Sequence, residues 1–138
     1  MIKNRILLSF VFAASILASG CGEDVLTGPT AVTGGVWKLQ SLETPALFVP
    51  VGRPESYTVE FRDAAVLAVK ADCNSCSGTY TISGSSLTIG ALACTRAFCG
   101  EASLDTAFLA VLTNASSFGV TDAELKIFSS KGTARLNR

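Results

Sequence analysis

Apolar and polar residues alternate in short runs along most of this chain. Tyr57, Val59 and Phe61, for example, are separated by Thr58 and Glu60. Successive side chains of a β-strand point to opposite faces of the sheet, so this spacing places the three apolar residues on one buried face. The alternation therefore predicts half-buried strands.

Turn residues separate these runs. Gly84 lies between two of them and supplies the positive φ that a tight hairpin loop requires, with Ile82 expected opposite Leu87. Neighbouring runs joined by such short turns are expected to pair as antiparallel strands. The predicted strands, in chain order, are 36–41, 57–61, 66–70, 78–82, 86–89, 118–120, 124–128 and 133–136.

A single segment has helical periodicity. Leu104, Phe108 and Leu112 recur every fourth residue and form one apolar stripe, and Ser103 precedes them as a capping residue. A helix is therefore predicted at about 103–114, packed by its apolar side on the sheet. The predicted fold class is α+β and mainly β, with antiparallel strands in a compact sheet or open barrel and one packed helix.

The N-terminus has a different pattern. Lys3 and Arg5 precede an apolar run over residues 6–17, and small residues and then Cys21 follow it. A helix that crosses a bilayer needs about 20 apolar residues, so this run favours a cleaved signal peptide over a retained transmembrane anchor. The segment resembles the signal of a bacterial lipoprotein, in which Cys21 is the predicted lipid-attachment residue.

Three parts of the chain follow from this interpretation: a signal peptide over 1–20, a lipidated flexible tether over 21–35, and one folded domain over 36–138. The tether is rich in Gly, Thr and Pro and lacks sustained periodicity. Ala18 occupies a position where Leu is commoner in lipoproteins, which leaves cleavage by an ordinary signal peptidase open.

Charge limits the kinds of partner. The chain has 11 basic and 11 acidic residues, and removing Lys3 and Arg5 leaves nine basic residues, a formal charge of −2. Without a cluster of Lys or Arg, the mature chain is not expected to bind nucleic acid. Membrane attachment is expected through the acyl chains on Cys21 alone.

Four further cysteines admit three chemistries: disulfides, a zinc site or a redox pair. Their spacing, two pairs separated by 17 residues, resembles that of zinc ribbons. Export to an oxidising compartment favours disulfides instead. Zinc remains the alternative, with the ligands Cys73, Cys76, Cys94 and Cys99, and otherwise no cofactor is expected.

The register of the predicted hairpin favours one pairing of these cysteines. Extending the register from the turn places Cys76 opposite Cys94, and Cys73 close to Cys99 after a small slip. The expected bridges are therefore nested, Cys73–Cys99 outside Cys76–Cys94.

The composition excludes several catalytic arrangements. The chain contains no histidine, so it cannot form Ser-His-Asp or Cys-His sites. Its carboxylates are scattered along strands and turns, which favours solvated residues over a catalytic pair. A non-enzymatic protein with no catalytic residues is expected.

From Gly35 to its end, the chain resembles the META domain family, which includes HslJ-like heat-shock proteins of the bacterial envelope. The resemblance rests on several short elements taken together: Trp37-Lys38-Leu39, Asp72-Cys73-Asn74, Ser77-Gly78-Thr79-Tyr80, Leu87-Thr88-Ile89 and Thr95-Arg96-Ala97-Phe98-Cys99. It implies antiparallel strands with a packed helix, and it agrees with a Cys73–Cys99 bridge. A role in stress protection is implied by the family alone.

Two functions remain open at this point. The first is a non-enzymatic cell-envelope lipoprotein, a monomeric binding or stress-protective module anchored by Cys21, most simply in the outer membrane and facing the periplasm. The alternative is a pilot-like carrier that binds lipid or an outer-membrane protein in an apolar groove between sheet and helix. The sequence identifies neither a ligand nor a partner.

Overall fold

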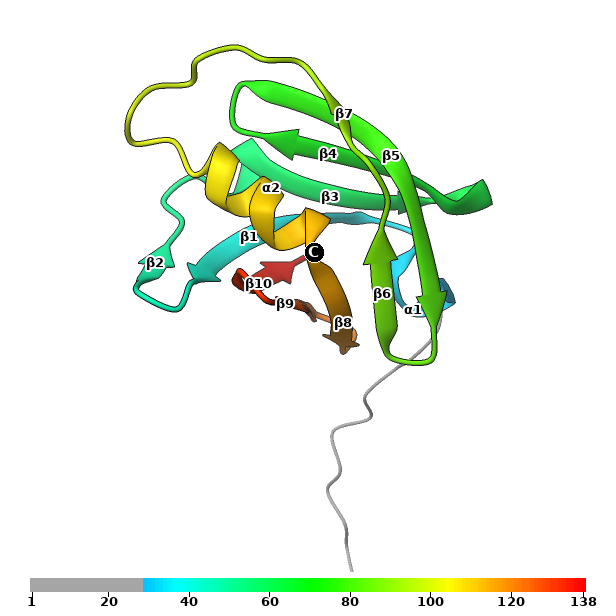
Figure 1. Cartoon of the computed structure of the whole chain (residues 1–138). Coiled ribbons are helices and arrows are strands. Elements are labelled where there is room, and N and C mark those ends of the chain that lie inside the picture. Colours follow the sequence, from blue (N-terminus) through cyan, green and yellow to red (C-terminus); the bar gives the residue numbers. More distant parts are fainter. Residues whose placement is uncertain (1–28) are drawn as a thin grey trace, which may run out of the picture.

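The computed structural model describes residues 29–138, and within them eight antiparallel strands close into a barrel (Figure 1). Each strand pairs with its neighbours in the order β1-β3-β4-β5-β6-β8-β9-β10, and β10 returns to β1. These strands are β1 (Val36–Glu43), β3 (Tyr57–Arg62), β4 (Val66–Ala71), β5 (Asn74–Ser83), β6 (Ser86–Ile89), β8 (Ala115–Val120), β9 (Glu124–Ser129) and β10 (Gly132–Asn137).

Closure occurs between the first and last barrel strands. Lys38 lies opposite Asn137, and Leu42 lies opposite Ala134. The predicted mainly-β fold is confirmed, but the barrel is closed rather than open. Two strands that the alternation does not predict are added outside the ring: β2 (Phe48–Pro50) pairs with β1, and β7 (Ala93–Cys94) pairs with β5.

Apolar side chains fill the barrel. The predicted alternation is visible in the burial of the strands, whose inward residues are covered while their neighbours face solvent. In the predicted hairpin, Gly84 has φ +58° and Ile82 lies opposite Leu87, as expected. The largest fully buried residues are Trp37, Leu39, Leu42, Phe61, Leu67, Leu87, Phe108, Leu112, Leu125, Ile127 and Leu136.

One end of the barrel is covered by helix α2 (Asp105–Thr113), which contacts β4, β6, β9 and β10 (Figure 1). Phe108, Val111 and Leu112 point into the core from this helix. The helix is about as long as predicted, but Leu104 rather than Ser103 is its N-terminal capping residue. The Ser103 hydroxyl instead accepts a hydrogen bond from the backbone N–H of Asp105.

Folding begins earlier than the predicted boundary at residue 36. A one-turn helix, α1 (Pro29–Val32), precedes β1, and Val32 is fully buried. Its carbonyl accepts a 2.7 Å hydrogen bond from the Trp37 indole, and Arg138 stacks over the same indole. Part of the segment predicted as a tether, Pro29–Val32, is thus helical, and its Val32 packs into the core.

The predicted signal peptide and Cys21 lie outside the described residues. Within residues 29–138, no helix has the length and hydropathy needed to span a membrane.

Candidate functional site

The segment most suited to a functional role is the loop over residues 90–104, which joins β6 to α2 at one end of the barrel. It runs beside β5, where β7 pairs with Cys76 and Ser77. Gly78 permits this close passage, because a Cβ there would lie 2.8 Å from the carbonyl oxygen of Ala91. We call residues 90–104 the stapled loop, because two disulfides hold it.

Both disulfides join the stapled loop to the region that begins β5. Cys76 pairs with Cys94 in the β5–β7 ladder, and Cys73 pairs with Cys99 just before β5. These are the pairs of the nested arrangement. The four sulfurs are bonded in two pairs, Cys73 with Cys99 and Cys76 with Cys94.

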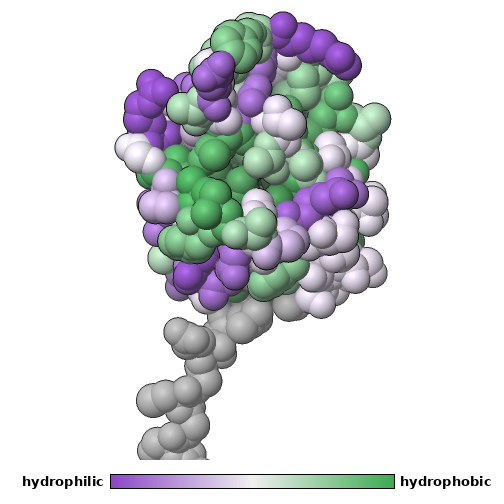
Figure 2. Space-filling view, turned by 60° about the vertical axis from the view of Figure 1, so that its left-hand side comes forward, coloured by the Kyte–Doolittle hydropathy of each residue, from purple (hydrophilic) through white to green (hydrophobic). Residues whose placement is uncertain are grey.

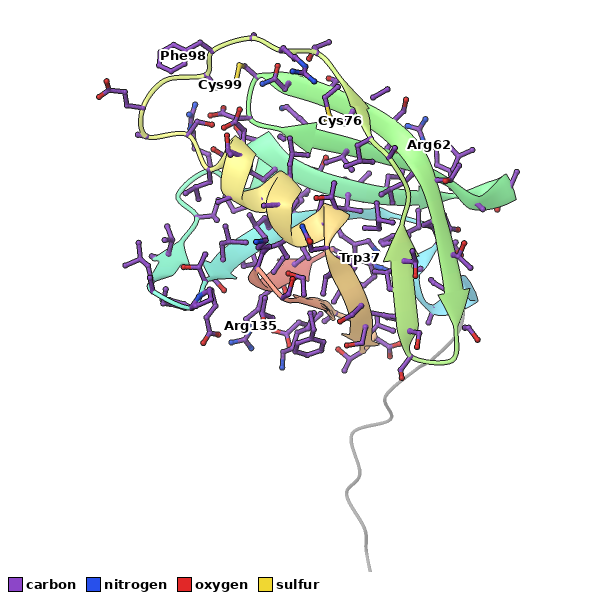
Figure 3. The ribbon with its side chains drawn as sticks, in the orientation of Figure 1. Trp37, Arg62, Cys76, Phe98, Cys99 and Arg135 are labelled. Atoms are coloured by element: carbon purple, nitrogen blue, oxygen red, sulfur yellow. A yellow bond between two sulfur atoms is a disulfide. The ribbon has the colours of Figure 1, made fainter. Side chains whose placement is uncertain are left out.

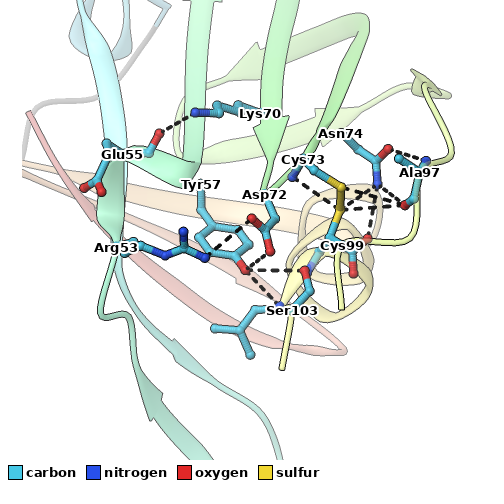
Figure 4. A network of polar contacts seen from close by, with 12 residues as sticks. Arg53, Glu55, Tyr57, Lys70, Asp72, Cys73, Asn74, Ala97, Cys99 and Ser103 are labelled. Atoms are coloured by element: carbon cyan, nitrogen blue, oxygen red, sulfur yellow. Dashed lines mark hydrogen bonds and ion pairs between the residues drawn. A yellow bond between two sulfur atoms is a disulfide. The ribbon is translucent and has the colours of Figure 1, made fainter. Parts of the chain in front are cut away.

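Asn74 holds the loop where the β5–β7 ladder ends (Figure 4). Its side-chain oxygen accepts hydrogen bonds from the Ala97 N–H at 2.8 Å and the Thr95 hydroxyl at 3.1 Å. Its amide group donates to the Ala97 carbonyl at 3.0 Å and lies 3.3 Å from both Cys99 Sγ and Asp105 Oδ2. The Asn74 side chain and the Ala97 backbone therefore form two hydrogen bonds, as one further residue pair of the ladder would. Because Asn74 is only 5% exposed, these polar contacts are largely shielded from solvent.

A second polar group fixes the end of the stapled loop. The Tyr57 hydroxyl donates to Asp72 Oδ2 at 3.1 Å and accepts a 3.0 Å hydrogen bond from the Leu104 N–H (Figure 4). Ser103 Oγ lies 3.5 Å from the same hydroxyl, and Arg53 lies 4.0 Å from Asp72. These contacts connect the start of α2 to the barrel wall.

An open hollow of about 490 Å³ lies beside the stapled loop. Phe98 stands at its margin and is 84% exposed, the most exposed large apolar side chain among the described residues. Figure 3 shows its ring projecting outward from the loop, near Cys99. The lining residues are Asn74, Leu92, Cys94, Thr95, Arg96, Ala97, Phe98, Asp105 and Leu109.

A second apolar area lies at β2, on the same side of the molecule. Leu47 is 61% and Phe48 57% exposed there. A smaller hollow of about 210 Å³ separates β2 from the end of the stapled loop, where Ala102 and Leu104 form part of its lining. Figure 2 shows this side of the molecule, with apolar residues gathered in its middle and polar residues around them.

Titratable groups with shifted pKa values lie on the barrel strands rather than on the stapled loop. Burial, together with the charge of Asp63, raises the pKa of Tyr80, whose hydroxyl donates to the Arg62 carbonyl. A hydrogen bond from Arg62 lowers the pKa of Glu60, and the pair is exposed. The Tyr80 hydrogen bond and the Glu60–Arg62 ion pair are both consistent with structural roles on the barrel strands.

Sequence reasoning found the cysteines of this site but missed its polar anchor and its exposed aromatic residue. Asn74 beside a cysteine suggests a local turn, yet its partners lie more than 20 residues away. Phe98 could have been noticed as an aromatic residue one position before a bridging cysteine, in a segment without strand alternation.

These features define a small closed antiparallel barrel with a loop held by disulfides at one end. The chain belongs to the META domain family, whose model matches residues 30–137 and confirms the resemblance. No curated protein matches the chain.

Solved structures share this fold at low sequence identity. A protein from Burkholderia xenovorans, known by NMR, is 18% identical with a TM-score of 0.66, and the match covers 99% of this chain and 98% of that one. A second protein known by NMR is 21% identical with a TM-score of 0.64, over 81% of this chain and 95% of that one. A DUF4847 family protein from Bacteroides vulgatus, known from a crystal structure, is 14% identical with a TM-score of 0.60, over 78% and 94%.

Proposed function

We propose that this META domain protein is a non-enzymatic binding module of the cell envelope, anchored by lipid on Cys21 and binding a protein partner through the stapled loop. The sequence around Cys21 supports export and lipidation. Two disulfides fit the oxidising compartment that an exported chain enters.

The observation that carries the proposal is Phe98. An 84% exposed phenyl ring gains nothing from the core, yet its loop is held by two disulfides and the Asn74 hydrogen bonds. A rigid, exposed aromatic side chain beside a hollow has the properties of an interface anchor, because little conformational entropy is lost when it is buried by a partner.

The position of the loop relative to the start of the domain supports the same role. The described chain begins at α1, on the opposite side of the barrel from Phe98 (Figures 1 and 3). A lipid anchor attached N-terminal to α1 would therefore join the domain on the side opposite the stapled loop and leave the loop accessible to other envelope proteins.

The interior of the barrel favours binding at the outer surface. A carrier that holds lipid between sheet and helix needs an apolar groove there. Phe108, Val111 and Leu112 occupy this place and are fully buried. The pilot-like carrier is therefore the weaker proposal, and co-purified lipid in native mass spectrometry would revive it.

The anchor is tested by fractionating cells that produce the full chain or its Cys21→Ala variant. We expect the full chain in the membrane fraction and the variant in the soluble fraction, with unchanged urea unfolding of the domain. Membrane association of Cys21→Ala equal to that of the full chain would contradict a lipid anchor.

The binding surface is tested by photo-crosslinking in whole cells, with benzoylphenylalanine in place of Phe98 or, as the matched control, of Phe128. Phe128 is also exposed, at 39%, but lies on β9. We expect a discrete protein adduct from position 98 and none from position 128. Adducts of equal yield from both positions, or no adduct from position 98, would show that the stapled loop is not the interface.

A further inference from the structure

We propose that the Cys73–Cys99 disulfide is a site of thiol–disulfide exchange with a dithiol protein, whereas Cys76–Cys94 is structural. The two bridges hold the same loop but differ in exposure. Cys73 is exposed and Cys99 half-buried, whereas Cys76 is only 6% exposed and Cys94 is half-buried. Exchange requires that a thiolate reach one sulfur of the bridge, so exposure favours Cys73–Cys99.

The inner bridge is embedded in paired strands. Cys76 and Cys94 are direct partners in the β5–β7 ladder, with their Cα atoms 4.0 Å apart. The Thr95 N–H continues this pairing with a 3.0 Å hydrogen bond to the Ser75 carbonyl. The burial of Cys76 under these paired strands hinders attack on its sulfur, although the half-buried Cys94 lines the hollow beside the loop.

The outer bridge has a stabilised leaving group on one side. Cys99 Sγ accepts hydrogen bonds from the backbone N–H of Cys73 and from the side-chain amide of Asn74, both at 3.3 Å. Hydrogen bonds to a sulfur stabilise its thiolate form, and exchange is faster when the leaving thiolate is more stable. Attack is therefore directed to Cys73 Sγ, with Cys99 as the leaving group.

The exchange proceeds in two balanced steps. A thiolate of the dithiol protein attacks Cys73 Sγ; a mixed disulfide forms, the Cys73–Cys99 bond breaks, and its electron pair stays on Cys99 Sγ. The second thiol of the partner then loses its proton to water and attacks its own sulfur in the mixed disulfide, which releases Cys73 as a thiolate. Two electrons from the dithiol reduce the bridge, the partner leaves as a disulfide, and both cysteines take protons from water.

Reduction would free the part of the stapled loop that carries Phe98. Cys94 remains bridged, so the release is confined to the segment between Cys94 and α2. Within it, the hydrogen bonds that remain include those of Asn74 with Thr95 and Ala97, those between Thr95 and Ser75, and that from the Leu104 N–H to the Tyr57 hydroxyl. The exchange does not depend on the binding role proposed above; only its effect on a partner at Phe98 rests on that role.

The test measures both bridges in the same native molecule. The purified domain is incubated with dithiothreitol without denaturant, samples are alkylated at intervals, and mass spectrometry follows each cysteine. We expect Cys73 and Cys99 to be alkylated at least about tenfold faster than Cys76 and Cys94, at a rate proportional to the dithiothreitol concentration. Equal rates, or faster reduction of the inner pair, would overturn the proposal.

Glutathione identifies the sulfur that is attacked. Trypsin cleaves after Lys70, Arg96 and Lys126, which separates Cys73 from Cys99. In a Cys76→Ala/Cys94→Ala variant, we expect the glutathione adduct on peptide 71–96 rather than on peptide 97–126. An adduct mainly on Cys99 would contradict the assigned leaving group, even if the outer bridge is the faster one.

Hydrogen exchange provides the structural readout and requires no partner. After selective reduction, we expect faster exchange of the Ala97 amide, with unchanged protection of Ile127 in β9. Loss of protection at Ile127 would mean that the outer bridge supports the whole barrel, which would contradict a local exchange site. Failure to find a partner at Phe98 would leave these results unaffected.

Discussion

The barrel wall and the stapled loop are stabilised by different interactions. In the wall, residues such as Leu39, Leu67 and Ile127 are fully buried, and every barrel strand pairs with a neighbour on each side. In the stapled loop, regular pairing is limited to the two residues of β7, and two disulfides and the Asn74 side chain hold the rest.

Because the two regions are stabilised differently, mutations should affect them differently. Apolar burial is shared among many side chains, so loss of one buried group weakens the wall as a cooperative unit. Covalent and polar contacts act at particular atoms, so their loss should loosen the loop locally. Four measurements test this contrast.

The largest effect is expected from a matched pair of phenylalanines. Phe61 is 1% exposed and packs edge-to-face on Tyr80, with ring centroids 5.0 Å apart, whereas Phe98 is 84% exposed. Phe61→Ala should lower the free energy of unfolding by about 3–5 kcal/mol, because it leaves a cavity. Phe98→Ala should change it by no more than about 0.5 kcal/mol. Urea denaturation measures both changes. Equal losses of unfolding free energy in the two variants would contradict the distinction between the barrel wall and the stapled loop.

Removing the inner bridge should have the next largest effect. Cys76 and Cys94 are 18 residues apart, so Cys76→Ala/Cys94→Ala should cost about 3 kcal/mol through the greater entropy of the unfolded chain. The denaturation midpoint in urea, compared without reductant, gives the value. A variant as stable as the unmodified chain would show that the ladder alone holds β7.

Asn74→Ala should cost about 1–3 kcal/mol, because the Ala97 N–H and carbonyl lose their partner. Asn74→Asp is the matched control: it keeps an acceptor for the Ala97 N–H but loses the amide donor and brings a negative charge close to Asp105. Hydrogen exchange should show faster exchange at Ala97 in the alanine variant and a smaller change there in the aspartate variant. Equal protection of Ala97 in all three proteins would contradict the role of Asn74 as an anchor.

The smallest effect concerns pH and the wall. Burial raises the pKa of Glu124, but hydrogen bonds from Lys126 and Arg135 outweigh it, so the pKa lies below its ordinary value of 4.5. The folded protein therefore gains stability from this carboxylate above about pH 4.5 and loses it as the pH falls through the lowered pKa. The gain should be below about 1 kcal/mol, as for surface ion pairs.

Glu124→Gln should remove this pH-dependent gain. Thermal unfolding of both proteins between pH 3 and pH 6 measures it as the difference between two curves. A difference that grows as the pH falls would have the wrong sign for the interactions described.

Local features of the wall could be predicted from the sequence. Tyr57, Val59 and Phe61 alternate and are all buried, and the register of Ile82 with Leu87 follows from one turn glycine. The alternation of side chains along a strand and the geometry of a short turn depend only on neighbouring residues, so both can be predicted from a single sequence.

Long-range pairings could not be predicted in the same way. Alternation places Leu39 on the same face as Trp37, but it does not show that the strand partner of Leu39 is Leu136. Val32 is buried although it lies in a stretch rich in Gly and Thr, and the residues on either side of it, Ala31 and Thr33, accept hydrogen bonds from the distant Arg138. Asn74 likewise gives no local signal, since its partners Thr95 and Ala97 become neighbours only after the chain has folded.

Closure of β1 with β10 also bears on aggregation. The lipid anchor proposed above would concentrate the protein on a surface, where an open sheet edge would template strand pairing between chains. Here the two ends of the ring pair with each other, and β2, which is added beside β1, has only three residues. One of them is Pro50, which has no N–H to donate. The barrel can therefore be present at high density with little backbone available for fibre growth.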